Sequence, residues 1–149
     1  MNKIIITLAG ICFMLSCSSS KNFRHSRKDS EESYFHKLKD DNTFFIQQYS
    51  DDPNYAYSPE KPVKVGGITE GPKNERRFLN ALCGPNGEPI KYIRQGSCCH
   101  FKSDKALFGD MAPLDIYEIQ YTGLKQKKFI YINMYDSDTL MVPVGLKLR

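Results

Sequence analysis

The chain has 149 residues, a formal net charge of +4, five cysteines and no tryptophan, and 40% of its residues are hydrophobic. This length leaves room for one modest domain and excludes a multidomain enzyme. Aromatic residues at 12% and charged residues at 26% are typical of a folded chain. The positive charge is weak and dispersed, so we expect no nucleic-acid partner, since such binding needs a basic face or stripe.

The N-terminus has the pattern of a bacterial lipoprotein signal peptide. A basic start at Lys3 precedes an apolar run over residues 4–15, which is too short to span a membrane. Ser16 and Cys17 follow, and the letters MLSC resemble the lipobox, in which the cysteine is acylated, with palmitate among the usual chains. We therefore expect a signal peptide over residues 1–16 and lipidation of Cys17, with acyl chains that anchor the protein stably to a membrane. An ordinary cleaved signal peptide is the alternative.

The residue after the lipobox bears on localisation. Ser18 is not acidic, and sorting rules known for Gram-negative lipoproteins then imply transfer to the outer membrane. We expect the protein to be anchored there and to face the periplasm. The inner membrane and the outer face are left as alternatives.

Composition changes near residue 52, because all eight prolines and nine of the ten glycines lie beyond it. Residues 17–52 carry mixed charge among serines, which predicts a lipid-anchored tether before a single domain over residues 53–149. A short helix is expected over residues 31–39, and a second turn near residues 43–49 could lie against the domain. A wholly flexible spacer is the alternative.

The domain is predicted to contain one helix, over residues 71–83. Gly71 and Pro72 suit its N-terminus, apolar residues recur on one face, and Gly84 ends it. The sequence thus predicts one short amphipathic helix.

Alternating apolar residues predict three strands, over residues 89–99, 115–122 and 129–135. The last of these is apolar on both faces, which suits a central strand. Residues 122–128 would join the second and third strands as an antiparallel hairpin. Two further segments, 62–65 and 144–148, are candidate edge strands. The sequence therefore predicts an α+β fold, in which one short helix packs on a face of a small, mainly antiparallel sheet.

Three cysteines remain in the predicted domain, which is an odd number for an oxidising compartment. Cys83 lies on the apolar face of the predicted helix, and Cys98 has the strand parity that faces this helix. We expect a Cys83–Cys98 disulfide, which would close a loop of about 15 residues and stabilise the fold by ~3 kcal/mol. A bulge at Gly96 would put Cys99 in the place of Cys98, and buried free thiols are the alternative.

Few side chains are candidates for a functional site. Arg76 and Arg77 lie at the start of the predicted helix, whose N-terminus favours anions, and we expect them, with His100, to be possible ligand-binding residues. A solvated helical turn is the alternative. Neighbouring Cys99 and His100 point apart in an extended strand, so no catalytic dyad is predicted.

The sequence contains no ligand spacing for a metal and no cofactor motif, so we expect neither a metal nor a cofactor. The lysine cluster at residues 125–128 suits a solvated loop or, alternatively, the binding of an anionic lipid or polysaccharide.

Several stretches resemble a family of small, largely uncharacterised lipoproteins of Gram-negative bacteria. The resemblance covers most of residues 62–149 and rests on KVGG (64–67), GPKNERRFLNALCGPNGEPI (71–90), GSCCHFK (96–102), LDIYEIQYTG (114–123) and YINMYD (131–136). Members often bear the name 2-dehydro-3-deoxyphosphooctonate aldolase. That name implies, as one alternative, a small enzyme that acts on sugars or sugar acids, but the family supplies no catalytic residues to carry over.

A barrel enzyme of the kind that this name evokes needs about 250 residues, far more than the predicted domain has. The sequence therefore favours a lipid-anchored cell-envelope protein that is a non-enzymatic binding or accessory module. The expected partner is an envelope protein or a glycan. The alternative enzyme would use Cys99, His100 and Arg76 or Arg77 in a cleft.

Overall fold

The structure is a computed structural model that describes residues 36–149. The predicted signal peptide, Cys17 and the first part of the predicted 31–39 helix lie outside the described residues. The described elements follow in chain order: β1 (Leu38–Asp40), β2 (Thr43–Phe44), β3 (Gln48–Tyr49), β4 (Val63–Lys64), the 3-10 helix η2 (Ile68–Glu70), α1 (Gly71–Asn80), β5 (Leu82–Cys83), β6 (Lys91–Lys102), β7 (Met111–Gln120), β8 (Lys128–Asn133), β9 (Met141–Val142) and β10 (Lys147–Leu148).

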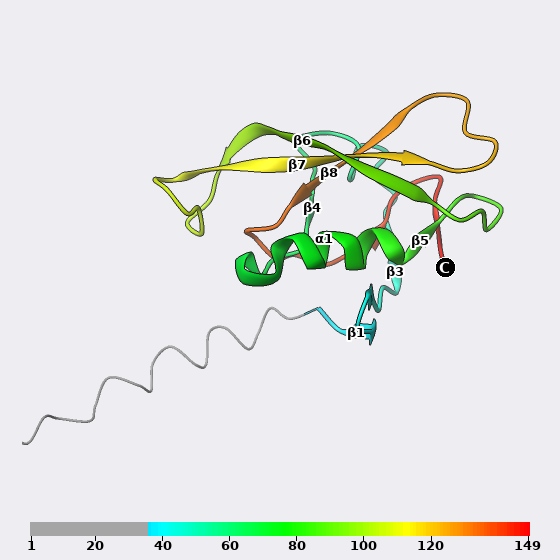
Figure 1. The fold of residues 1–149 in the computed structure, drawn as a ribbon, viewed down its shortest axis with the longest axis horizontal. Coiled ribbons are helices and arrows are strands. Elements are labelled where there is room, and N and C mark those ends of the chain that lie inside the picture. The colour runs from blue at the N-terminus through cyan, green and yellow to red at the C-terminus, as the bar shows by residue number, and fades with distance from the viewer. Residues whose placement is uncertain (1–35) are drawn as a thin grey trace, which may run out of the picture. The chain divides into compact units, whose positions relative to one another are not determined.

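A four-stranded sheet in the order β4-β8-β7-β6 forms the centre of the fold. β6, β7 and β8 are antiparallel neighbours, whereas the short edge strand β4 runs parallel to β8. Figure 1 shows α1 along one face of this sheet. The expected α+β fold is confirmed, as are the β7–β8 hairpin and the edge strand near residue 63.

The helix begins where the sequence predicts and ends earlier. Pro72 lies in the first turn, where its missing N–H costs nothing. After Asn80 the chain straightens, and β5 pairs with β10 near the C-terminus. The prediction that Cys83 belongs to the helix is therefore wrong, because Leu82 and Cys83 satisfy their backbone groups against another strand.

The core lies between α1 and the sheet. Phe78 and Leu79 from the helix are almost fully buried, as are Ile130 and Ile132 from β8. Tyr117 on β7 is the cross-strand partner of Ile130, so the two side chains share the face toward α1.

Residues before position 52 contribute to this core. Phe44 and Ile46 are 3% and 6% exposed, and both belong to the main hydrophobic cluster. Residues 38–40 form a strand rather than the predicted helix, because β1 pairs with β2 across a tight turn. The folded part therefore begins earlier than the compositional boundary suggests, and residues 36–52 are not all tether.

In the described part of the chain, no helix has the length and apolar character needed to cross a membrane.

Candidate functional site

An open groove with an aromatic lining lies beside β8. Its volume is about 480 Å³. The lining consists of Pro53, Tyr57, Lys127, Lys128, Phe129, Tyr131 and Val144. Ligand sites are concave and mostly apolar, with a few polar groups that fix orientation, so this groove is the candidate binding site.

Strand periodicity puts two of these rings in the groove. Phe129 and Tyr131 alternate along β8 with Ile130 and Ile132, which are fully buried. Ile130 lies opposite Tyr117, whose hydroxyl contacts α1. The two isoleucines therefore face α1, and the two aromatic rings face the opposite side of the sheet.

Segments distant in sequence form the opposite wall. The backbone N–H of Tyr131 donates to the carbonyl of Ala56 at 2.8 Å, and this bond holds the loop that contains Ala56 and Tyr57 beside β8. The Tyr57 hydroxyl donates to the carbonyl of Val144 at 2.9 Å. Ala56 is fully buried with φ of 69°, a left-handed conformation that few non-glycine residues adopt, and it redirects the chain there.

Two lysines line the groove, and the lining, all of it within residues 36–149, includes no carboxylate. The Nζ of Lys128 lies 4.4 Å from the centre of the Tyr57 ring, in a cation–π contact. The Nζ of Lys127 lies 3.1 Å from Oε2 of Glu118, while 73% of the Lys127 side chain is exposed. Burial raises the pKa of Tyr57, so its phenol stays neutral at physiological pH.

The predicted ligand-binding residues lie apart. Arg77 is buried and donates to Oε2 of Glu70 and to Oδ1 of Asn74, both at 2.7 Å. Arg76 is exposed on α1, and His100 is exposed on β6. Among residues 36–149, no hydrogen bond or ion pair joins the three, and no group of three or more His, Cys, Asp or Glu side chains could hold a metal ion.

The cysteines pair differently from the expectation. Cys98 is bonded to its neighbour Cys99, and Cys83 is a buried free thiol. The structure therefore corrects the predicted Cys83–Cys98 pairing. Cys83 lies on β5, where its Sγ donates to the carbonyl of Leu148 at 3.2 Å. Cys98 lies opposite Leu114, whose position on β7 faces away from α1.

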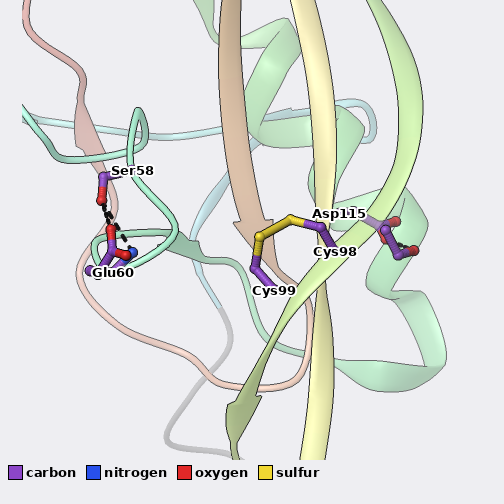
Figure 2. Close-up of a disulfide and its surroundings, with 6 residues drawn as sticks. Ser58, Glu60, Cys98, Cys99 and Asp115 are labelled. Carbon is purple, nitrogen blue, oxygen red and sulfur yellow. Dashed lines mark hydrogen bonds between the residues drawn. A yellow bond between two sulfur atoms is a disulfide. The ribbon is translucent and has the colours of Figure 1, made fainter.

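Irregular pairing of β6 with β7 accounts for the disulfide between the adjacent residues Cys98 and Cys99. The register with β7 shifts between Cys98 and Phe101, and Cys99 has φ of 53°. This bulge brings two adjacent side chains to one side of the strand, which a regular strand cannot do. Figure 2 shows the disulfide directed away from Asp115. Because its sulfur is bonded, Cys99 offers no thiolate nucleophile.

A buried acidic cluster lies between α1 and the sheet, away from the groove lining. Arg94 donates two hydrogen bonds to Asp115, at 2.6 and 2.8 Å, and Ser97 donates a third at 2.7 Å. Glu75 is fully buried and accepts a hydrogen bond from the Tyr117 hydroxyl at 2.7 Å. Burial, with the nearby charge of Asp115, raises the pKa of Glu75 to about 7.

Asp115 titrates in the opposite direction. Burial by itself would raise its pKa, but the hydrogen bonds from Arg94 and Ser97, together with the charge of Arg94, hold the pKa below its usual value. Such a pair of carboxyl groups with separated pKa values can mark an acid–base site. Glu75 has no exposed surface, so its carboxyl group joins α1 to the sheet and has no contact with solvent.

Sequence reasoning did not find the groove, although it singled out the lysine cluster at residues 125–128. The available signal was the alternation of aromatic rings with isoleucine in β8, directly after two lysines. The wall from Tyr57 could not be found in this way, because its position depends on the contact between Ala56 and Tyr131.

No family model matches this chain, and no match was found among curated proteins or solved structures. The groove is therefore interpreted from its own residues.

Proposed function

We propose that this protein is a lipid-anchored cell-envelope protein whose folded domain is a non-enzymatic binding module. The aromatic groove beside β8 carries the proposal, since it is concave, rich in rings and supplied with positively charged side chains. Its partner is an envelope glycan or an envelope protein.

The anchor is part of the same proposal and rests on sequence. The short basic start, the apolar run and Ser16 before Cys17 support acylation of Cys17. Ser18 supports an outer-membrane location with the domain in the periplasm. The resemblance to a family of small lipoproteins supports the same assignment.

A small enzyme that acts on sugars or sugar acids is the alternative that the sequence allows. That enzyme would bring Cys99, His100 and an arginine into one pocket. In the structure Cys99 is in a disulfide and Arg77 is in an ion pair with Glu70. The groove is lined by none of these residues, so the geometry favours the binding module.

The anchor is tested by Cys17→Ser. We expect this variant to lose acyl labelling and to leave the membrane fraction, whereas the parent chain keeps both. Unchanged membrane retention would contradict lipidation of Cys17.

The binding role is tested by a photoreactive side chain at Val144, on the rim of the groove, in intact cells. A matched probe at Lys91, an exposed position on β6 outside the groove, is the control. We expect covalent adducts with an envelope glycan or protein from the Val144 probe and not from the Lys91 probe. Equal labelling from both positions would count against the groove as the binding site.

A further inference from the structure

We infer that the groove binds an acidic polysaccharide, with sugar rings packed on Phe129 and Tyr131 and acid groups held by Lys128. This inference rests on the proposed function and narrows it to one class of ligand.

The two rings on β8 suit a polymer with repeating units. Phe129 and Tyr131 are two positions apart on one strand, so they project on the same side about 6.6 Å apart. The C–H face of a pyranose packs well against an aromatic ring, because both surfaces are flat and weakly polar. Tyr57 adds a third ring across the groove. The groove is open to solvent, so it does not enclose its ligand.

The charges in the lining favour an acidic ligand over a neutral one. Lys127 and Lys128 are its charged residues. Glu118 already pairs with Lys127 at 3.1 Å, whereas no ion pair joins Lys128 to a carboxylate within the described residues, so Lys128 is the cation that the groove offers to a ligand. Lys128 already has its Nζ 4.4 Å from the centre of the Tyr57 ring, so a cation stands beside a stacking surface. A carboxylate on a stacked sugar can accept a charge-assisted hydrogen bond from the Lys128 ammonium group.

Backbone pairing argues against an extended peptide as the ligand. A peptide that adds a strand needs free backbone groups at a sheet edge. β8 lies between β4 and β7, and the N–H of Tyr131 donates to the carbonyl of Ala56. These bonds occupy Tyr131 and the C-terminal end of β8, so they leave only the short stretch before Tyr131 for strand addition. Side chains are therefore the main recognition groups of the groove, as a glycan requires.

The test uses calorimetric titration of the full lipidated chain in detergent. The first probe is oligogalacturonate, and the second is its methyl ester, which keeps the sugar rings but has no charge. The third is dextran sulfate, which carries its negative charge on sulfate groups in a different arrangement. We expect oligogalacturonate to bind about tenfold more tightly than its methyl ester.

Two substitutions test the two parts of the inference. Tyr131→Ala and Lys128→Met should each weaken oligogalacturonate binding by about tenfold. Phe108→Ala and Lys91→Met, at exposed positions outside the groove, should leave it unchanged. Should Tyr131→Ala fail to fold, Tyr131→Phe keeps the ring and should bind normally, while Lys128→Met still tests the charge.

One outcome would show that the ligand need not be acidic: the ester and the acid bind equally tightly, and Tyr131→Ala loses both. That result would overturn the inference and leave the proposed binding module intact. The same holds if no sugar binds while the Val144 probe still captures an envelope protein. Another outcome would also overturn the inference: dextran sulfate binds as tightly as oligogalacturonate, and Lys91→Met weakens the binding of both polymers as much as Lys128→Met does. Binding would then be general ion exchange.

Discussion

The hydroxyl of Tyr117 donates a hydrogen bond of 2.7 Å to Oε2 of Glu75 and thereby links β7 to α1 inside the core. The carboxyl group is fully buried, and its second oxygen has no hydrogen-bond partner within the described residues. Burial disfavours the charged form, so the folded protein keeps Glu75 protonated at a pH where an exposed glutamate has ionised.

We expect the free energy of unfolding to fall as the pH rises from about 4.5 to about 7. The Glu75 pKa is raised from 4.5 to about 7, so in this window the folded state binds a proton that the unfolded chain has lost. The decrease is at most ~3 kcal/mol. Glu75→Gln is neutral at every pH and should remove it. Urea unfolding at a series of pH values measures both chains.

Asp51→Asn, at an exposed position, is the control and should keep the parent pH dependence. Tyr117→Phe removes a hydrogen bond that lowers the Glu75 pKa, so Glu75 in this variant should have a higher pKa than in the parent chain. The stability of the variant should therefore keep falling to a higher pH. Because the pKa of Asp115 is lowered from 3.8, its contribution to stability is lost as the pH falls below 3.8. This pH range does not overlap the range in which Glu75 titrates.

Burial lowers the pKa of His36 from 6.5, so His36 makes stability rise with pH in part of the range in which Glu75 titrates, equally in the parent chain and in Glu75→Gln. The test is therefore the difference in stability between these two chains, and a difference that stays constant between pH 5 and about 7 would refute a buried protonated Glu75.

Arg94→Met should destabilise the fold by about 1–2 kcal/mol. The substitution leaves the carboxylate of Asp115, which is 9% exposed, without its paired cation. The Arg94 side chain is 47% exposed, so solvent screening reduces the effect. Lys64→Met breaks a more exposed pair with Asp138 and should cost under about 0.5 kcal/mol. Thermal unfolding of the two variants gives the comparison, and equal losses would argue against a special role for Arg94.

Thiol labelling should identify Cys83 as the free cysteine among residues 36–149. In denaturant without reductant, an alkylating reagent should modify Cys83 and spare Cys98 and Cys99, which are bonded to each other. After reduction all three should react. Peptide mapping by mass spectrometry locates the labels, and a label on Cys99 with Cys83 protected would restore the Cys83–Cys98 pairing.

Phe44→Ala should cost about 3 kcal/mol, because Phe44 is 3% exposed and packs in the main core. Its neighbour Phe45 is 40% exposed, and Phe45→Ala should cost under about 1 kcal/mol. Denaturant unfolding of both variants separates a core segment from a tether. Two neutral substitutions would place residues 36–52 outside the cooperative fold.

Local patterns were enough to predict most of the sheet. The alternation of Tyr117 and Ile119 placed β7, and the isoleucines of β8 placed its neighbour, because strand periodicity is visible in a few residues. The helix start was also visible at Pro72. Its end was not, because Leu82 leaves the helix only to pair with Leu148, a partner far along the chain.

The candidate site depended more heavily on such distant contacts. Sequence parity placed Cys98 toward the helix, but the irregular pairing of β6 and the position of Cys83 on β5 removed that contact. The lysine pair was visible in the sequence, whereas Tyr57 reaches the groove only through the bond between Ala56 and Tyr131. The residue pattern of one strand predicts which side chains share a face of the sheet. It does not predict which segments of the chain pack against that face.

If Cys17 carries the lipid anchor, as we propose, the early start of the fold limits how far the domain can lie from that anchor. With lipidation at Cys17 and the described strands beginning at Leu38, about 20 residues separate the two, and a fully extended chain of that length spans no more than ~70 Å. A tether that ran to residue 52 could reach about 120 Å. On this proposal, the first described strand would stay within ~70 Å of the acylated residue, which keeps the domain closer to its anchor than the compositional boundary alone would.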